Sequence, residues 1–197
     1  MIKTMLDFNL ILQTNEILLR PIKLDDFDPF SKLTYDKSMW IYFTSDLSEK
    51  AELKKWIETA VIENEKKIRL AFTVIDKSTN NPIGSTSFGN ISYKDKRIEI
   101  GWTWICKEYQ GKGGNDQIKF LMLHYCFEKM DFERVEFKTD VLNIHARKSL
   151  LRIGAKEEGI LRSHTLMTHN RRRDTIYYSI LKSEWSEMKM KSRWEIR

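Results

Sequence analysis

The segment from Arg97 to Met130 constrains the fold more strongly than any other part of the chain. It reads RIEIGWTWICKEYQGKGGNDQIKFLMLHYCFEKM, which predicts a strand over 97–105, a glycine-rich turn and a long helix. Such a turn leaves several backbone N–H groups unpaired at the positive end of the helix dipole. Because those groups can bind a phosphate or pyrophosphate, the segment predicts an anion-binding site.

The pattern after this segment predicts a parallel pair of strands. Residues 135–141 alternate β-branched and aromatic with polar side chains, as in a half-buried strand. A strand, a helix and a strand in this order favour a right-handed crossover, which would place 97–105 and 135–141 parallel.

The rest of the chain alternates between helical and extended patterns. Before the segment we predict a strand over 16–22, a short helix after Asp26, a helix capped by Ser48, and an antiparallel hairpin of 69–76 with 83–90. After it we predict a helix over 145–152 that ends near Gly154, and strands over 159–162 and 174–181. No element is expected beyond Trp185.

The predicted strand over 97–105 carries an unexpected carboxylate. Regular alternation would put Glu99, Gly101, Thr103 and Ile105 on one face and Ile98, Ile100, Trp102 and Trp104 on the other. Glu99 therefore either pairs with a nearby Lys or Arg, or serves as a catalytic base. In the following helix, Asn115 or Asp116 is the expected N-cap.

Length and composition indicate one globular domain. The 197 residues contain no Pro/Gly/Ser-rich linker, so we assign 1–197 to a single domain with a core of about 15–185 and frayed ends. The net charge of +6 would suit anionic partners. We favour a well-solvated surface instead, because the basic residues are scattered apart from the cluster 171–173, which either contacts an anionic ligand or forms a solvated loop.

Cysteine usage and hydropathy predict a cytoplasmic protein without a metal. Cys106 and Cys126 have no CxxC or metal-ligand spacing, so they are interpreted as buried thiols in a reducing compartment. The N-terminal residues lack a signal-peptide cleavage pattern, and no stretch is long enough to span a bilayer.

Several motifs together resemble one family. They are Gln110-Gly-Lys-Gly-Gly-Asn115, the preceding Glu99-Ile-Gly-Trp102, Asn143, Ile153-Gly-Ala155 and Glu158-Gly159. In this combination the chain resembles the GNAT superfamily of acyl-CoA-dependent N-acyltransferases, and in particular the ribosomal-protein N-acetyltransferase branch. The resemblance covers about 15–185 as an order of elements. It implies an α+β, three-layer fold: a mixed, mostly antiparallel twisted sheet with one splayed parallel strand pair, and helices on both faces.

The resemblance also implies a site for acetyl-CoA, used as a co-substrate and without a metal. In the family, the glycine-rich turn binds the pyrophosphate of coenzyme A, the end of the preceding strand pairs with the pantetheine arm, and an Asn after the next strand contacts the same molecule. Where the family has a final Gly or Ala in the turn, this chain has Asn115. The implied cofactor-binding residues are Ile105, Gln110, Gly111, Lys112, Gly113, Gly114, Asn115 and Asn143.

The chemistry of acetyl transfer to an amine requires a base and a proton donor. A lysine-like amine has a pKa of about 10.4, so a carboxylate that accepts its proton helps near neutral pH. Glu99 is the first choice for this base, with Glu158 and His164 in reserve.

The proton donor for the thiolate is left open by the sequence. Relatives often place a Ser three positions, or a Tyr seven positions, after the Asn, but here these positions hold Ala146 and Leu150. Ser149 is the nearest hydroxyl, and either it is the donor or it bonds back to its own helix. A solvent proton, or Tyr177 or its neighbour Tyr178, is the alternative.

Three functions remain open from the sequence. The leading hypothesis is an acetyl-CoA-dependent N-acetyltransferase that acts on a primary amine of a small molecule or a protein N-terminus, as a monomer or homodimer. The second is a non-catalytic acyl-CoA-binding or regulatory module, because the usual Ser or Tyr is missing. The third, a ribosome- or nucleic-acid-binding protein, is disfavoured by the scattered charge.

Overall fold

The computed structural model describes residues 5–191. Its strands are β1 (Leu12–Gln13), β2 (Ile17–Pro21), β3 (Leu70–Asp76), β4 (Asn81–Ser92), β5 (Arg97–Ile105), β6 (Arg134–Asp140), β7 (Lys156–Leu166) and β8 (Arg172–Leu181). Its α-helices are α1 (Phe27–Ser31), α2 (Lys50–Glu65), α3 (Gly114–His124), α4 (Ile144–Arg152) and α5 (Lys182–Lys191). A π-helical turn, η4 (Tyr125–Lys129), continues α3.

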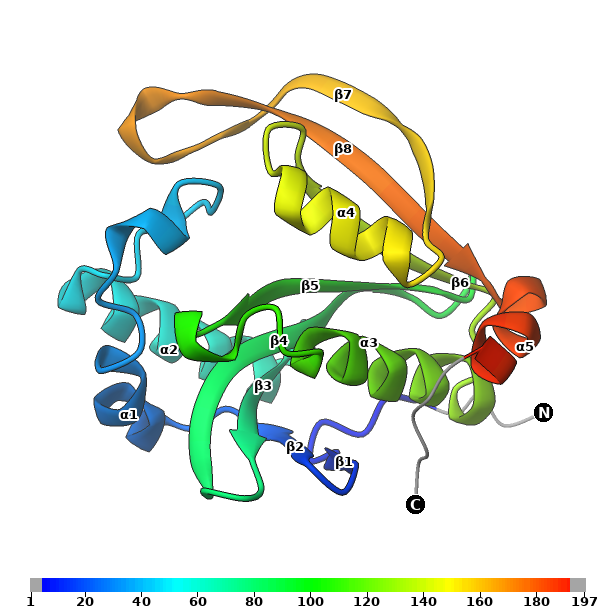
Figure 1. Ribbon diagram of the computed structural model, residues 1–197, viewed down its shortest axis with the longest axis horizontal. Helices are drawn as coiled ribbons and strands as arrows, with labels where there is room; N and C mark the ends of the chain where they lie inside the picture. The colour runs from blue at the N-terminus through cyan, green and yellow to red at the C-terminus, as the bar shows by residue number, and fades with distance from the viewer. Residues whose placement is uncertain (1–4, 192–197) are drawn as a thin grey trace.

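Within this part of the chain, the strands form one sheet in the order β1-β2-β3-β4-β5-β6-β8-β7 (Figure 1). All neighbouring strands are antiparallel except β5 and β6, which are parallel. This confirms the predicted parallel pair and the mostly antiparallel mixed sheet. Parallel neighbours must be joined by a crossover connection. The turn before α3 therefore lies at the carboxyl end of β5, at the start of the crossover that leads to β6.

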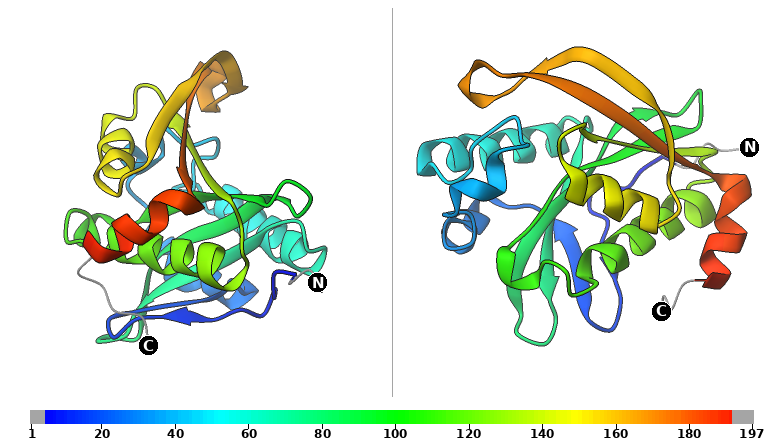
Figure 2. Two further views of the ribbon diagram at one scale, coloured as in Figure 1. Left: turned by 90° about the vertical axis from the view of Figure 1, so that its right-hand side faces the viewer. Right: turned by 45° about the horizontal axis from the view of Figure 1, so that its top comes forward.

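Helices cover both faces of the sheet (Figure 2). On one face, α1 and α2 bury Phe30, Leu53 and Ile57 in a cluster with Trp40 and Trp104. On the other face, α3, α4 and α5 contribute to a larger cluster in which apolar residues of β2–β6 and β8 are packed. The two clusters hold the sheet from opposite sides, so the strands that carry the candidate site are fixed between them.

The alternation predicted for β5 is wrong beyond Ile100. Ile98, Ile100 and Ile105 lie in the α3-side cluster, whereas Trp104 lies in the α2-side cluster. The change comes from a β-bulge against β4 at Ser85–Ser87, where Trp102 has a positive φ of 51°. A bulge adds one residue to one strand, so the side chains after it exchange faces.

Two predicted helix caps are also wrong. The N-cap of α2 is Glu49 rather than Ser48, whose hydroxyl donates to Asp46. The N-cap of α3 is Gly113, in the left-handed conformation, rather than Asn115 or Asp116. The helix therefore starts earlier than predicted, directly on the glycines of the turn.

The helix α5 was not predicted, because its sequence has no apolar periodicity. Trp185 packs it against α3 and η4, since its ring lies 5.4 Å from that of Phe120 and 5.7 Å from that of Phe127, centroid to centroid. The indole N–H of Trp185 donates to Glu128. The contacts of this one aromatic residue fix the position of α5, and no apolar periodicity in its sequence indicates them. Residues 192–197 of the predicted frayed end lie outside the described residues.

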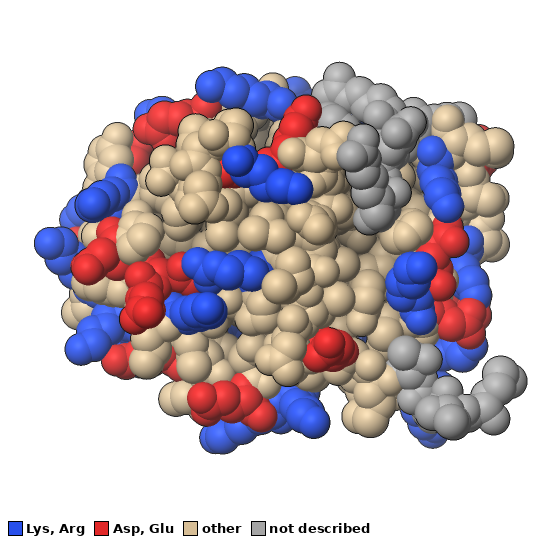
Figure 3. Space-filling model, turned by 90° about the horizontal axis from the view of Figure 1, so that it is seen from below, with Lys and Arg blue, Asp and Glu red and all other residues tan. Residues whose placement is uncertain are grey.

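The surface shows both charge signs. On the face in Figure 3, Lys and Arg side chains are interspersed with Asp and Glu around a broad uncharged area, rather than gathered into one basic patch. No helix formed by residues 5–191 has the length and apolar character needed to cross a membrane. Both Cys106 and Cys126 are buried free thiols, as predicted, and burial raises the pKa of the Cys106 thiol to about 11.

Candidate active site

The parallel strands β5 and β6 pair over only three residues and then separate. Their register runs from Arg97 opposite Arg134 to Glu99 opposite Glu136. Beyond this point β5 continues alongside β4, while β6 continues alongside β8, so the sheet divides into two diverging parts (Figure 1). The edge of β5 that faces this wedge therefore carries backbone groups without a strand partner, and an extended ligand can pair with them.

The turn that follows β5 leads directly into α3 and leaves backbone amides free at the start of that helix. Gly111 and Gly113 have φ values of 74° and 85°, which glycine adopts far more readily than residues with a Cβ. Gly113 caps α3 without any side-chain hydrogen bond to the first turn. The N–H groups of Gly114, Asn115 and Asp116 consequently have no intrahelical partner, and they lie at the positive end of the α3 dipole.

Two side chains hold this turn in place. The Gln110 amide donates to the carbonyl of Ile105 over 2.8 Å, which ties the turn to the end of β5. The Lys112 ammonium lies 5.7 Å from the centre of the Tyr109 ring, so it stays beside the turn. The Tyr109 hydroxyl in turn donates to Asp76. The turn is thus preorganised and carries one positive charge.

Helix α4 brings two more predicted residues to the same region. Asn143 is its N-cap and accepts a hydrogen bond from the backbone N–H of Ala146 at 3.0 Å through Oδ1, which leaves its NH₂ group as a donor. Ser149 accepts a hydrogen bond from the side-chain amide of Asn115 at 3.0 Å. Ser149 therefore lies beside the first turn of α3, close to the glycine-rich turn.

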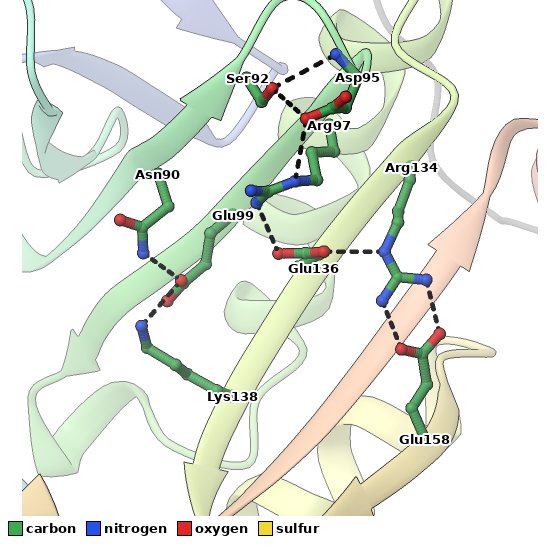
Figure 4. Close-up of polar contacts among 9 residues, drawn as sticks. All are labelled: Asn90, Ser92, Asp95, Arg97, Glu99, Arg134, Glu136, Lys138 and Glu158. Carbon is green, nitrogen blue, oxygen red and sulfur yellow. Dashed lines mark hydrogen bonds and ion pairs between the residues drawn. The ribbon is translucent and has the colours of Figure 1, made fainter. Parts of the chain in front are cut away.

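Glu99 lies at the point where β5 and β6 separate, and it is only 3% exposed. Its carboxylate accepts a hydrogen bond from Asn90 on β4 at 2.6 Å and pairs with Lys138 on β6 at 2.9 Å (Figure 4). The ion pair with Lys138 confirms the structural interpretation of Glu99, and its role as a catalytic base stays a prediction. The carboxylate has a lysine partner, and it also faces a cavity.

Gly101 creates the room for this carboxylate. A Cβ atom at position 101 would lie 2.8 Å from Oε1 of Glu99, closer than real Cβ atoms approach an oxygen. The glycine of the Glu-Ile-Gly-Trp sequence therefore has a physical reason, because it leaves room for the Glu99 carboxylate in the position that it occupies.

The cavity next to Glu99 has a volume of about 620 Å³. That size suits a small ligand or the end of a peptide. Residues from the α2–β3 connection, β4, the β4–β5 turn, β5, β6 and β8 line it: Lys67, Ile68, Asn90, Ile91, Tyr93, Arg97, Glu99, Glu136, Lys138 and Tyr177. Charges of both signs face the cavity, and Figure 4 shows that Arg97, Glu136 and Arg134 are linked in a chain of ion pairs across β5 and β6.

The two reserve bases lie farther from this arrangement. Glu158 makes a bidentate contact with Arg134 and accepts from Ser179. The hydrogen bonds from Arg134 lower the pKa of Glu158, although partial burial opposes the shift. His164 lies on the β7–β8 hairpin, where its ring is 6.1 Å from that of the cavity-lining Tyr177.

The other tyrosine, Tyr178, is buried inside the fold. Its hydroxyl accepts from Nε of Arg147 at 3.2 Å and donates to Glu157 at 3.3 Å. Of the two tyrosines considered as proton donors, Tyr177 is thus the one that faces the cavity.

The arginine cluster 171–173 makes contacts inside the molecule. Arg171 pairs with the buried Asp140, and Arg172 bonds to the hydroxyl and carbonyl of Ser163. Arg173 is buried and donates to Thr175 over 3.0 Å. These contacts stabilise the β7–β8 hairpin, so the cluster has a structural role without an anionic ligand. In the described part of the chain, no group of three or more His, Cys, Asp or Glu residues could hold a metal ion.

Sequence reasoning missed Asn90, Lys138 and Lys119, all of which lie around the wedge. Asn90 and Lys138 come from strands on either side of β5, so only the pairing register brings them to Glu99. Lys119 is a buried lysine on α3. The sequence could have indicated its burial, because a lysine in a helix that is apolar on most of its surface has to be buried.

Comparisons with known proteins agree with this geometry. A family model described as an acetyltransferase (GNAT) domain matches residues 16–156. The uncharacterized N-acetyltransferase p20 of Bacillus licheniformis is 26% identical over 179 residues, which cover 89% of this chain and 98% of that protein. YdaF of Bacillus subtilis (strain 168), provisionally named a ribosomal N-acetyltransferase, is 36% identical over 102 residues, or 52% of this chain and 55% of YdaF.

Solved structures show the same architecture. A protein of T. thermophilus, provisionally described as an acetyltransferase, superimposes with a TM-score of 0.85 at 25% identity, covering 95% of this chain and 97% of the other. The family model, the p20 relative that aligns over nearly its full length, and the fold thus agree with the predicted resemblance. The chain belongs to the GNAT acetyltransferase family.

Proposed function

We propose that this protein is an acetyl-CoA-dependent N-acetyltransferase that acts on a primary amine of a small molecule or of a protein N-terminus. The observation that carries the proposal is the continuity of two features. The unpartnered edge of β5 leads without interruption from the cavity at Glu99 to the amide-rich turn at Gly111–Asn115. Membership of the GNAT family supports acetyl transfer as the reaction class.

The residues present suit acetyl-CoA. The unpaired amides of Gly114–Asp116 and the positive charge of Lys112 would hold its pyrophosphate, and the backbone at Ile105 would pair with its pantetheine arm. Asn143 has an NH₂ group to donate, and the hydroxyl proton of Ser149 is not used in the bonds it accepts from Asn115 and Arg152. When bound, acetyl-CoA supplies the acetyl group as an activated thioester.

Glu99 is the proposed base. Its carboxylate lies where the cavity meets the wedge, and it can take the proton that an acceptor amine loses, directly or through one water molecule. Lys138 and Asn90 fix the carboxylate in position. The relationship to YdaF supports a protein N-terminus as one class of acceptor, and the open cavity does not restrict the acceptor to a small molecule.

An acceptor screen tests this function. The purified protein is incubated with acetyl-CoA and a panel of primary amines and peptides with free N-termini, while thiol release is followed. Each peptide is paired with the same peptide carrying a blocked N-terminus. The proposal predicts acceptor-dependent thiol release for at least one free amine and none for its blocked form. Tight binding of acetyl-CoA without acceptor-dependent release would instead indicate a non-catalytic acyl-CoA-binding module.

A further inference from the structure

Lys119 is a buried lysine without an ion-pair partner. It lies on the second turn of α3 and is 5% exposed. Within residues 5–191, no carboxylate lies within 4.0 Å of its ammonium group. A fully buried lysine is rare unless it is paired, because removing an ammonium group from water costs several kcal/mol. The placement of this amine therefore needs a reason beyond the packing of α3.

The amine lies inside the wedge between β5 and β6. Its Nζ donates to Oγ1 of Thr103 on β5 over 2.7 Å, and it lies 5.7 Å from the centre of the Phe137 ring on β6. Thr103 and Phe137 both follow the last paired residues, Glu99 and Glu136. The ammonium group thus reaches from α3 to the place where the two strands have already separated.

The surroundings of Lys119 tune its protonation. Burial lowers its pKa to about 7, while the negative charge of Glu99 opposes the shift. The charged groups that flank the wedge are Glu99 from β5 and Lys138 from β6, and these pair with each other. From β4 and β5 the neighbouring groups are the hydroxyls of Thr86 and Thr103, which are hydrogen-bonded at 2.8 Å. Near neutral pH, Lys119 can therefore both hold and release a proton.

Ser149 lies at the other end of the proposed ligand. It is bonded to Asn115 at the start of α3, whereas Lys119 lies farther along the same helix, beside the strands. If the phosphates of acetyl-CoA bind to the turn, the thioester at the other end of the molecule lies away from the turn. The position of Lys119 therefore suits the sulfur better than that of Ser149.

We propose that Lys119 is the proton donor to the departing CoA thiolate. This assignment rests on the proposed acetyl transfer. In the reaction, the nitrogen lone pair of the acceptor amine forms the new N–C bond, and Glu99 takes the proton lost from that nitrogen. The C–S bond breaks, its electron pair goes to sulfur, and the Lys119 ammonium gives its proton to sulfur. Glu99 then releases one proton to water and Lys119 regains one, so the protons balance. A thiolate whose thiol has a pKa of about 8.5 accepts the proton readily from such a donor.

Binding of free CoA to a Lys119→Met variant tests the proposal without turnover. Methionine has a similar length and no charge, so it fills the same space, and Lys129→Met, at an exposed lysine on η4, is the matched control. The thiol pKa of bound CoA is measured from the ultraviolet absorbance of the thiolate. In the wild type and in Lys129→Met the nearby ammonium should hold this pKa below its ordinary value, whereas in Lys119→Met it should be higher by about one unit or more.

Activity gives the second readout. Loss of a general acid typically lowers the rate about 10²- to 10⁴-fold, so kcat should fall by this amount in Lys119→Met while the Kd for acetyl-CoA changes less than about threefold. An unchanged kcat together with an unchanged thiol pKa would overturn the assignment. Failure of the wild-type protein to bind any CoA species would instead overturn the proposed function itself.

A measurement on the wild-type protein covers the case in which the variant does not fold. The titration of the Lys119 amine is followed by NMR through its ¹³Cε signal, with bound CoA and with a CoA analogue in which hydrogen replaces the thiol. The proposal predicts that only CoA shifts the titration midpoint of Lys119. Identical midpoints with both compounds would show that the amine does not sense the sulfur, and would overturn the assignment.

Discussion

Substitution of Gly113 by alanine tests whether the glycine-rich turn binds the ligand. Gly113 caps α3 with φ 85° and ψ −7°. A residue with a Cβ is destabilised in this left-handed conformation by about 1–2 kcal/mol. For 197 residues, an unfolding entropy of about 2.1 cal/mol/K per residue converts this into a fall in Tm of about 2–5 °C. The variant should therefore remain folded at room temperature.

The effect of Gly113→Ala on acetyl-CoA should exceed its effect on stability. Either the added methyl group blocks access to the free amides at the start of α3, or the backbone shifts and moves these amides. In both cases we expect the Kd for acetyl-CoA to rise about tenfold or more, which corresponds to about 1.4 kcal/mol. Thermal denaturation followed by circular dichroism and isothermal titration calorimetry measure the two quantities.

Gly154→Ala is the matched control for backbone strain. Gly154 has φ 90° after the end of α4, so alanine there meets the same conformational penalty. The new Cβ would lie 3.2 Å from Cε of Met188, the end of a flexible side chain that can move. We expect a similar fall in Tm and an unchanged Kd. If both variants bind acetyl-CoA equally well, or both lose affinity equally, the turn is not the binding site that we infer.

Two further predictions concern carboxylates. Glu99→Gln should lower kcat by about 10²- to 10³-fold with little change in the KM for acetyl-CoA, as measured by thiol release. The control Glu133→Gln should leave kcat unchanged. Equal activity of both variants would exclude Glu99 as the base. Asp26→Asn should lower the free energy of unfolding by about 3 kcal/mol, against less than about 1 kcal/mol for exposed Asp25→Asn, because the buried carboxylate of Asp26 is paired with Arg20 at 2.5 Å. Burial alone would raise the pKa of Asp26, but hydrogen bonds from Arg20 and Thr73 outweigh it and hold the pKa below 3.8, so this stabilisation is present above about pH 4 and is lost as the pH falls through the folded-state pKa. Denaturant unfolding between about pH 6 and pH 3 checks the sign, since Asp26→Asn should lose less stability than the wild type over this range; an equal loss would contradict it.

The strand–turn–helix unit and the parallel pairing were predictable because their signals are local. Apolar alternation in 97–105, glycines at 111–114 and the apolar helix that follows depend only on neighbouring residues, and the crossover rule then sets the direction of β6. The family resemblance added the splayed pair and the helices on both faces, which the structure confirms.

The features that the sequence did not predict depend on contacts between distant segments. The bulge at Trp102 arises where β5 meets β4, so no alternation within β5 alone reveals it. Likewise, the partners of Glu99, which are Asn90 and Lys138, reach it only through the register of three strands. The contact between Ser149 and Asn115 joins α4 to the start of α3, so it too was invisible in the local sequence, and the role of Ser149 as a proton donor stays a prediction.

Hydrogen–deuterium exchange in the presence of acetyl-CoA tests the central claim most directly. The claim is that the edge of β5 and the turn before α3 form one continuous site for acetyl-CoA. We predict that saturating acetyl-CoA slows amide exchange in peptides that cover 103–116, while peptides from the hairpin of β3 and β4 at 76–82 keep their rates. Unchanged exchange over 103–116, despite demonstrated binding of acetyl-CoA, would contradict the account.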